Sequence, residues 1–249
     1  MDSLSSTLLL PVVTNVVAAS TGAVVASAFE GSNAVAVVLV SYMLWGMGMG
    51  TAMMLVTAYL MRLTLHGLPP KEAMASAFIP LGPMGQSSYG IQILGVQALR
   101  VFPKELPQIQ YLGEILHALG FTLGIFIWAL AFWWLMQGIY SALYTRVHGP
   151  IPFNLGWWAL IFPVGTFAST SSSLWGLTGY TFYRVVTAFM VVGLFALWVF
   201  VLLHTIWYAW SGELFKPANI RRLELASTDA NSDDDGESGI IERKKKIDV

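Results

Sequence analysis

Long apolar runs separated by short polar segments fill residues 1–215 of this 249-residue sequence. Each run is long enough to cross a hydrocarbon core about 30 Å thick, which takes roughly 20 helical residues. The runs lack the alternation of polar and apolar positions that a membrane-spanning β-barrel requires, whereas a helix satisfies its own backbone groups in lipid. The pattern predicts an all-α polytopic membrane protein with about six transmembrane helices, near 7–29, 34–61, 73–99, 115–144, 155–176 and 180–210.

The six segments alternate in character. The first, third and fifth carry proline, glycine and small polar residues in mid-span, whereas the second, fourth and sixth contain no proline. This alternation predicts three helical hairpins, each pairing an interrupted helix with a smoother one. Non-helical backbone at membrane depth is tolerated only inside protein or beside a water-filled cavity. We therefore expect the interrupted helices to share a concave interior and the smooth helices to face lipid.

Charged residues divide the chain into two regions. Residues 216–249 hold more charges than all preceding residues and few apolar side chains, which predicts a disordered cytosolic tail. The net charge of -1 is an average over unlike parts and gives no indication of a nucleic-acid partner. An even number of spans puts both termini on one side, and basic residues favour that side, so the positive-inside rule predicts a cytoplasmic C-terminus.

No catalytic constellation is visible in the sequence. The chain has no cysteine, which excludes disulfides, thiolate nucleophiles and thiolate metal sites. The four histidines are scattered, and none stands at metal-ligand spacing from another: His66, His117, His148 and His204. We therefore expect neither enzyme activity nor a metal or other cofactor.

The third segment contains the most interrupted stretch, SAFIPLGPMGQSSYGI. Breaks there would free backbone groups to meet a solute, and the N-terminal end of a helix attracts anions. The residues that would line such a pathway are Pro80, Gly82, Pro83, Gly85, Gln86 and Ser87. A proline kink packed against neighbouring helices, with no solute involved, explains the same residues. The first segment offers a weaker candidate in Pro11, Thr14 and Asn15.

In the fifth segment Phe162 precedes Pro163 in mid-span, and Thr166 follows them. A phenylalanine at this depth can close a narrow hydrated pore as an apolar plug. Composition alone favours packing of Phe162 in the core.

The same blocks carry a family resemblance: LLPVVTNVVAASTGAVVA, SYMLWGMGMG, FIPLGPMGQSSYGIQILG and FNLGWWALIFPVGTFA. The chain resembles the C-terminal part of the tellurite-resistance/dicarboxylate transporter (TDT) family. That family includes fungal sulfite efflux pumps, fungal malate permeases and the slow anion channels of plant guard cells. The PLGPMGQSSYGIQILG block, with LPP before it, is most similar to the sulfite-pump branch.

The resemblance implies a ring of ten helices in five hairpins, of which this chain would supply the last three. The inner helix of each hairpin would line a central pore, often within a trimer of such proteins. Phe162 falls where the family's pore-occluding phenylalanine lies, which reverses the interpretation from composition alone.

By this resemblance, we expect a transporter that moves sulfite or bisulfite outward across the plasma membrane, with a small anion and the lipid bilayer as its partners. One alternative is a transporter of a C4-dicarboxylate such as malate. Because three hairpins cannot close the ring, we also expect a fragment, a truncated gene product or a second chain that completes it. A truncated remnant that does not transport is the remaining alternative.

Overall fold

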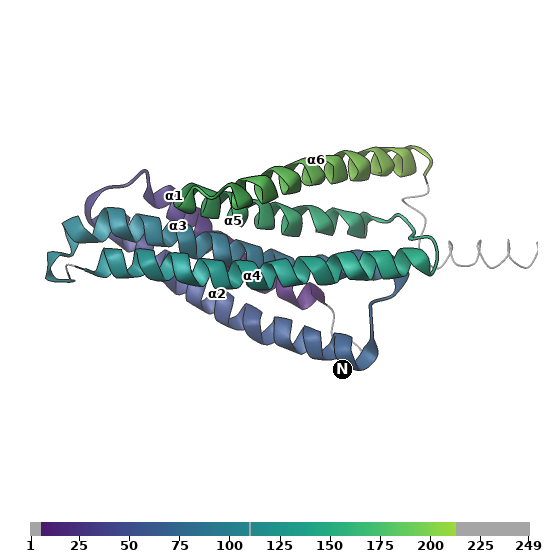
Figure 1. Ribbon diagram of the computed structural model, residues 1–249, viewed down its shortest axis with the longest axis horizontal. Coiled ribbons are helices and arrows are strands. Elements are labelled where there is room, and N and C mark those ends of the chain that lie inside the picture. The colour runs from purple at the N-terminus through teal and green to yellow at the C-terminus, as the bar shows by residue number, and fades with distance from the viewer. Residues whose placement is uncertain (1–5, 110, 213–249) are drawn as a thin grey trace, which may run out of the picture. The chain divides into compact units, whose positions relative to one another are not determined.

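The computed structural model describes residues 6–109 and 111–212, and every regular element in these residues is helical. The chain divides into two compact units, residues 1–201 and 202–249. The prediction of an all-α chain with six helices is confirmed, whereas the predicted tail, residues 216–249, lies outside the described residues. The six helices are α1 (Leu10–Ala26), α2 (Gly31–His66), α3 (Leu81–Glu105), α4 (Leu112–Val147), α5 (Ile161–Thr178) and α6 (Thr181–Trp210) (Figure 1).

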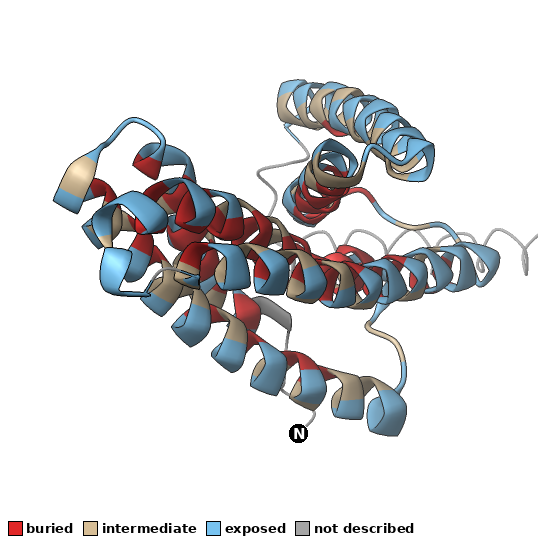
Figure 2. Ribbon diagram, turned by 60° about the vertical axis from the view of Figure 1, so that its left-hand side comes forward, coloured by how far each residue is buried: buried red, intermediate tan, exposed pale blue. Residues whose placement is uncertain are grey.

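The even-numbered helices are the long ones. Of the described helices, α2, α4 and α6 are long and apolar enough to cross a membrane. In their most apolar windows only 22%, 28% and 6% of residues are buried, and Figure 2 shows pale blue, exposed positions over most of α6. Apolar helices that stay this exposed are typical of elements that face lipid or another membrane helix.

A 3-10 segment leads into each odd-numbered helix. These segments are η1 (Ser6–Leu9) before α1, η2 (Lys71–Phe78) before α3 and η4 (Leu155–Leu160) before α5; a further short one, η3 (Pro107–Ile109), precedes α4. The helix prolines expected in mid-span instead stand at the start of α1, α3 and α5. There the missing N–H costs nothing, because the first backbone amides of a helix have no intrahelical partner. Each interrupted span is therefore a 3-10 stretch followed by an α-helix, and not an α-helix kinked at its centre.

The odd-numbered helices pack side by side, α1 against α3 and α3 against α5. Helix α2 contacts α1 and α3, and α4 contacts α3 and α5. The neighbours pair in ascending order, because Gly82 lies against Phe162 and Gly85 against Thr166. Helices α3 and α5 are thus parallel, as two inner helices of successive hairpins must be.

Glycines bring the backbones of α3 and α4 together. A methyl group at Gly120 would lie 2.6 Å from the carbonyl oxygen of Ile91, and one at Gly113 would lie 2.8 Å from that of Ala98. These separations are shorter than a side-chain carbon tolerates, so both positions need glycine. Small residues serve this purpose at helix contacts in membranes, where close packing replaces the hydrophobic effect as the driving force.

Candidate functional site

A cavity of 620 Å³, here called the N-terminal cavity, is lined by α1, by the turn before α3 and by the start of α5. Thr14 of α1, Ile79 at the start of α3, and Phe162 and Pro163 of α5 contribute to its wall. The N-terminal end of a helix carries partial positive charge, although the 3-10 segments accept some first-turn amides, as the Ile79 carbonyl does from the Gly82 N–H at 3.0 Å. The starts of α1 and α5 bring such charge to a largely apolar cavity.

The length of η2 bears on how deep this cavity would lie in a bilayer. The segment has eight residues, beginning at the exposed Lys71. At a rise of about 2 Å per residue, a 3-10 helix of this length covers roughly 16 Å. That is about half of a hydrocarbon core of roughly 30 Å. If η2 runs along the membrane normal, α3 begins near the middle of the membrane.

A second cavity, of 790 Å³, lies between α3, α5 and α6 and is here called the polar cavity. Gln86 and Tyr89 of α3 line it, together with hydroxyl groups of α5 and α6: Thr166, Ser169, Ser172, Ser173 and Thr187. The lining contains no charged side chain. The Gln86 amide donates to the Ser20 hydroxyl of α1 at 2.5 Å, which links the wall of this cavity to a third inner helix.

Among the described residues, Phe162 alone lines both cavities. Its side chain is 43% exposed, and a methyl group at Gly82 would lie 3.1 Å from its Cε1 atom. The ring therefore lies against a position of α3 that has no side chain of its own. Phe162 forms the boundary between the N-terminal cavity and the polar cavity.

The structure places the predicted pathway residues in two groups. Thr14, Gln86, Phe162, Pro163 and Thr166 line the two cavities. The others do not: Pro11 is exposed at the start of α1, and Asn15, Pro80, Gly82, Pro83, Gly85 and Ser87 contribute to packing between helices or to helix starts.

Gly85 and Ser87 show how the second group is used. A methyl group at Gly85 would lie 2.7 Å from the Thr166 Oγ1 atom, so this glycine permits the crossing of α3 and α5. Ser87 is fully buried, and its carbonyl accepts a hydrogen bond of 2.9 Å from the indole of Trp45 in α2. Its backbone therefore faces an outer helix and not a cavity.

Sequence reasoning missed Tyr89 and the serines of α5. Ser169 and Ser173 follow Thr166 at intervals of three and four residues, which places all three on one face of the helix. This spacing is visible in the sequence and indicates the α5 wall of the polar cavity.

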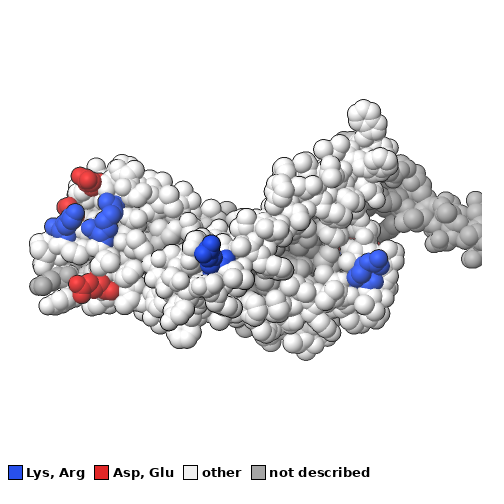
Figure 3. All heavy atoms as spheres, turned by 45° about the horizontal axis from the view of Figure 1, so that its top comes forward, with Lys and Arg blue, Asp and Glu red and all other residues white. Residues whose placement is uncertain are grey.

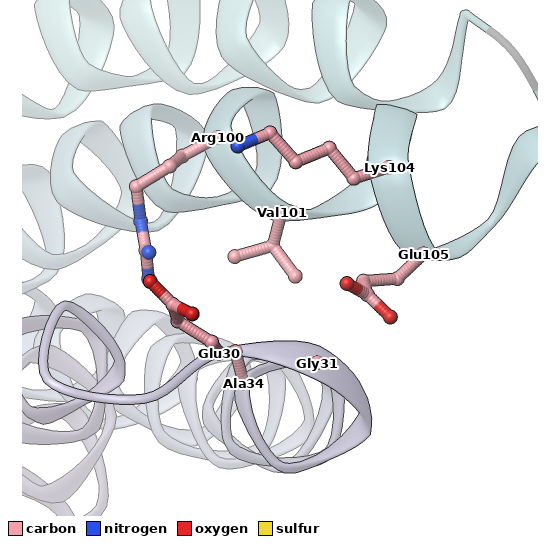
Figure 4. Close-up of a pocket in the computed structure, with 7 residues that line it drawn as sticks. All are labelled: Glu30, Gly31, Ala34, Arg100, Val101, Lys104 and Glu105. Atoms are coloured by element: carbon pink, nitrogen blue, oxygen red, sulfur yellow. The ribbon is translucent and has the colours of Figure 1, made fainter.

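Charged residues gather at one end of the described chain, where Figure 3 shows blue and red spheres close together. A third cavity, of 520 Å³, is lined there by residues of both signs (Figure 4): Glu30, Gly31, Ala34, Arg100, Val101, Lys104 and Glu105. The Arg100 guanidinium donates to the Ala26 carbonyl at 2.6 Å, at the C-terminal end of α1. A cation at this position complements the negative end of the helix. We therefore assign Arg100 a role in ending α1.

Metal chemistry finds no support in the described part of the chain, where no three histidine or acidic side chains come together in a suitable group.

Residues 1–206 match the voltage-dependent anion channel family, SLAC1. The chain belongs to this family. A sulfite efflux pump of Arthroderma otae is 35% identical over 217 residues, which cover 87% of this chain and 57% of the pump. A sulfite efflux pump of Candida albicans is 28% identical over 76% of this chain and 41% of its own length. An uncharacterized transporter of Methanocaldococcus jannaschii is 28% identical over 72% of this chain and 48% of its own length.

Membership of the SLAC1 family confirms the resemblance inferred from the sequence blocks and identifies a multi-pass integral membrane protein. It also fits the expectation that the chain is not an enzyme. The chain spans about half the length of the curated relatives that it matches. No solved structure matches it.

Proposed function

We propose that this chain forms part of a pathway that carries sulfite or bisulfite outward across the plasma membrane, with its C-terminus in the cytoplasm. The observation that carries the proposal is Phe162, because it stands between two uncharged cavities in the wall made by the inner helices. The sulfite efflux pumps among the relatives support the choice of substrate.

A small oxyanion suits the chemistry of these walls. Its oxygen atoms accept hydrogen bonds, and the Ser172 and Ser173 hydroxyls and the Gln86 amide are donors in the polar cavity. The N-terminal cavity offers the partial charges of helix ends without a fixed cation. Attraction of this moderate strength lets an anion enter and also leave, as conduction requires.

Phe162 is the proposed gate. An apolar ring at a constriction excludes water, and an anion cannot pass through a constriction that holds no water. The position of the ring against Gly82, together with its 43% exposure, supports a side chain that projects from the wall. Pro163 and Thr166, which follow it in α5, would hold the helix start beneath the gate.

The proposed pore needs more helices than the described chain contains. Helices α1, α3 and α5 would form only part of the pore wall. We propose that two further hairpins, from the same protein or from a second chain, complete a ring of ten helices. A trimer of such rings is the assembly that we propose. Residues 216–249 would form the cytosolic tail.

Efflux in cells that lack their own sulfite pump tests the proposal. The chain would be expressed alone and joined to the first two hairpins of the Arthroderma otae pump. We expect sulfite resistance and efflux of radiolabelled sulfite from the joined protein. Efflux of labelled malate without sulfite would favour the dicarboxylate alternative. Correct membrane insertion of both proteins without any anion efflux would favour a remnant that does not transport.

A further inference from the structure

A buried hydrogen-bond network joins three helices next to the polar cavity. Ser88 and Gln92 of α3 and Thr170 of α5 are 0%, 1% and 0% exposed. The Gln92 amide nitrogen lies 2.9 Å from the Thr170 hydroxyl and 3.1 Å from the Ser88 hydroxyl. The two hydroxyl oxygens are 2.6 Å apart, and Ser88 donates to the Gly124 carbonyl of α4 at 2.7 Å. We call these three side chains the polar lock.

The available protons fix the direction of every bond in the polar lock. Ser88 has one hydroxyl proton, and it is used on the Gly124 carbonyl. Thr170 must therefore donate to Ser88, and the Gln92 amide donates to both hydroxyls. All donors are satisfied, and among the lock's side-chain atoms only the Gln92 Oε1 atom has no partner. A network with one proton arrangement is specific, since removing one hydroxyl leaves buried groups unpaired.

The polar lock continues the contact between α3 and α5. Gly82 lies against Phe162, Gly85 against Thr166, and Ser88 against Thr170, so the lock is the last step of one parallel register. The first two steps are van der Waals contacts of glycines, which offer no side-chain hydrogen bond to fix the register. The third is directional. Thr170 lies eight residues after Phe162, or about 12 Å along the helix.

Helix α4 is shaped to receive this network. A methyl group at Gly124 would lie 2.6 Å from the Cγ atom of Gln92, so the glycine makes room for the side chain. One turn later the Trp128 indole donates to the Ser171 hydroxyl of α5 at 2.8 Å, which adds a second polar tie between α4 and α5. Polar groups buried inside a membrane protein cost free energy unless they are hydrogen-bonded, as these are.

We propose that the polar lock is a positioning device for the gate: it holds α5 in the register that keeps the Phe162 ring against Gly82. The proposal rests on the proposed function of Phe162 as a gate. Without the lock, α5 can shift against the glycines of α3, and the boundary between the two cavities opens more often.

Thr170→Val and Thr170→Ser form the matched pair of variants that tests this. Valine keeps the shape of threonine and removes the hydroxyl, whereas serine keeps the hydroxyl. In the joined protein we expect Thr170→Val to raise basal sulfite flux about three- to tenfold, because hydrogen bonds between membrane helices shift equilibria by roughly this factor. Thr170→Ser, which keeps the hydroxyl, should show sulfite flux close to that of the parent protein. Thr122→Val, which removes an exposed hydroxyl bonded within α4, serves as the control.

The Phe162→Ala background separates positioning from general stability. If the lock acts through the gate, Thr170→Val adds no further flux once the ring is gone. An equal increase with and without Phe162 would overturn the proposal, as would unchanged flux in a Thr170→Val protein that folds normally.

Thiol labelling gives a readout that does not depend on anion transport. This chain has no cysteine; once any cysteine of the two added hairpins is replaced by serine, Thr14→Cys and Ser172→Cys report separately on the N-terminal cavity and the polar cavity. A membrane-impermeant maleimide is applied to each side of the membrane in turn. We expect Thr170→Val to allow each cysteine to be labelled from the side that the gate otherwise blocks. Altered labelling without sulfite flux would reject the proposed substrate and keep the lock, whereas flux with unaltered labelling would reject the lock alone.

Discussion

Replacement of Phe162 by alanine distinguishes a gate from a core residue. A fully buried phenylalanine loses about 3 to 5 kcal/mol of stability on truncation to alanine. Phe162 is 43% exposed, so its truncation should cost only about 2 kcal/mol by the same scale. The ring forms the boundary between the N-terminal cavity and the polar cavity, and its loss joins them. We expect a modest fall in stability together with a rise in anion flux.

Phe167, on the same helix, provides the matched control. It is 0% exposed and stacks on Trp128 with ring centroids 5.4 Å apart. Phe167→Ala should therefore cost the full 3 to 5 kcal/mol or so without opening the boundary. The assay compares thermal unfolding in detergent with sulfite flux in liposomes for the joined protein. The reasoning is refuted if Phe162→Ala destabilises as much as Phe167→Ala, or if it folds well and carries flux at or below that of the parent.

Three further predictions concern packing, capping and the tail. Gly120→Ala should cost about 1 to 3 kcal/mol through overpacking against α3, whereas Gly50→Ala, with nothing within 4 Å, should be neutral or slightly stabilising in the same unfolding assay. Arg100→Gln should cost about 1 kcal/mol by exposing carbonyls at the end of α1; Arg184→Gln, in the first turn of α6, is its control, and equal losses would contradict the capping role. Deletion of residues 218–249 should leave membrane integration intact, as measured by resistance to alkaline extraction, and loss of integration would show that these residues form a docked element.

The number and order of helices could be predicted because apolar runs separated by polar segments mark them in the sequence. The break inside each odd-numbered span could be located only approximately. Apolar side chains continue across η2 into α3, so hydropathy does not show where the 3-10 geometry ends. The prolines mark the break, yet a proline is compatible with a kink in mid-helix as well as with a first turn. The structure places Pro80 and Pro163 at the starts of α3 and α5.

The candidate site was predicted only in part, for a physical reason. The direction in which a helical side chain points repeats every 3.6 residues, but the sequence does not say which face meets a neighbour. Gln86 and Ser87 are adjacent in the chain; Gln86 lines the polar cavity, whereas Ser87 is fully buried and its backbone carbonyl accepts from Trp45 of α2. Gly82 and Gly85 are used for contact with α5 and not for backbone exposure. The wall residues on α5 were recoverable from the spacing of Thr166, Ser169 and Ser173, because equal chemistry on one face is a periodic signal.

The proposed anion-attracting region arises from repetition, and this explains why no single motif locates it. Each hairpin begins with a 3-10 segment before an α-helix starts. The three helices that repeat this design are neighbours, and the starts of α1 and α5 and the turn before α3 line one cavity. The PLGPMGQ block supplies only one of these turns, and the charge on a single helix end is small and falls off within one turn. Selectivity for an anion would therefore depend on the register between helices, which is the property that Ser88, Gln92 and Thr170 fix.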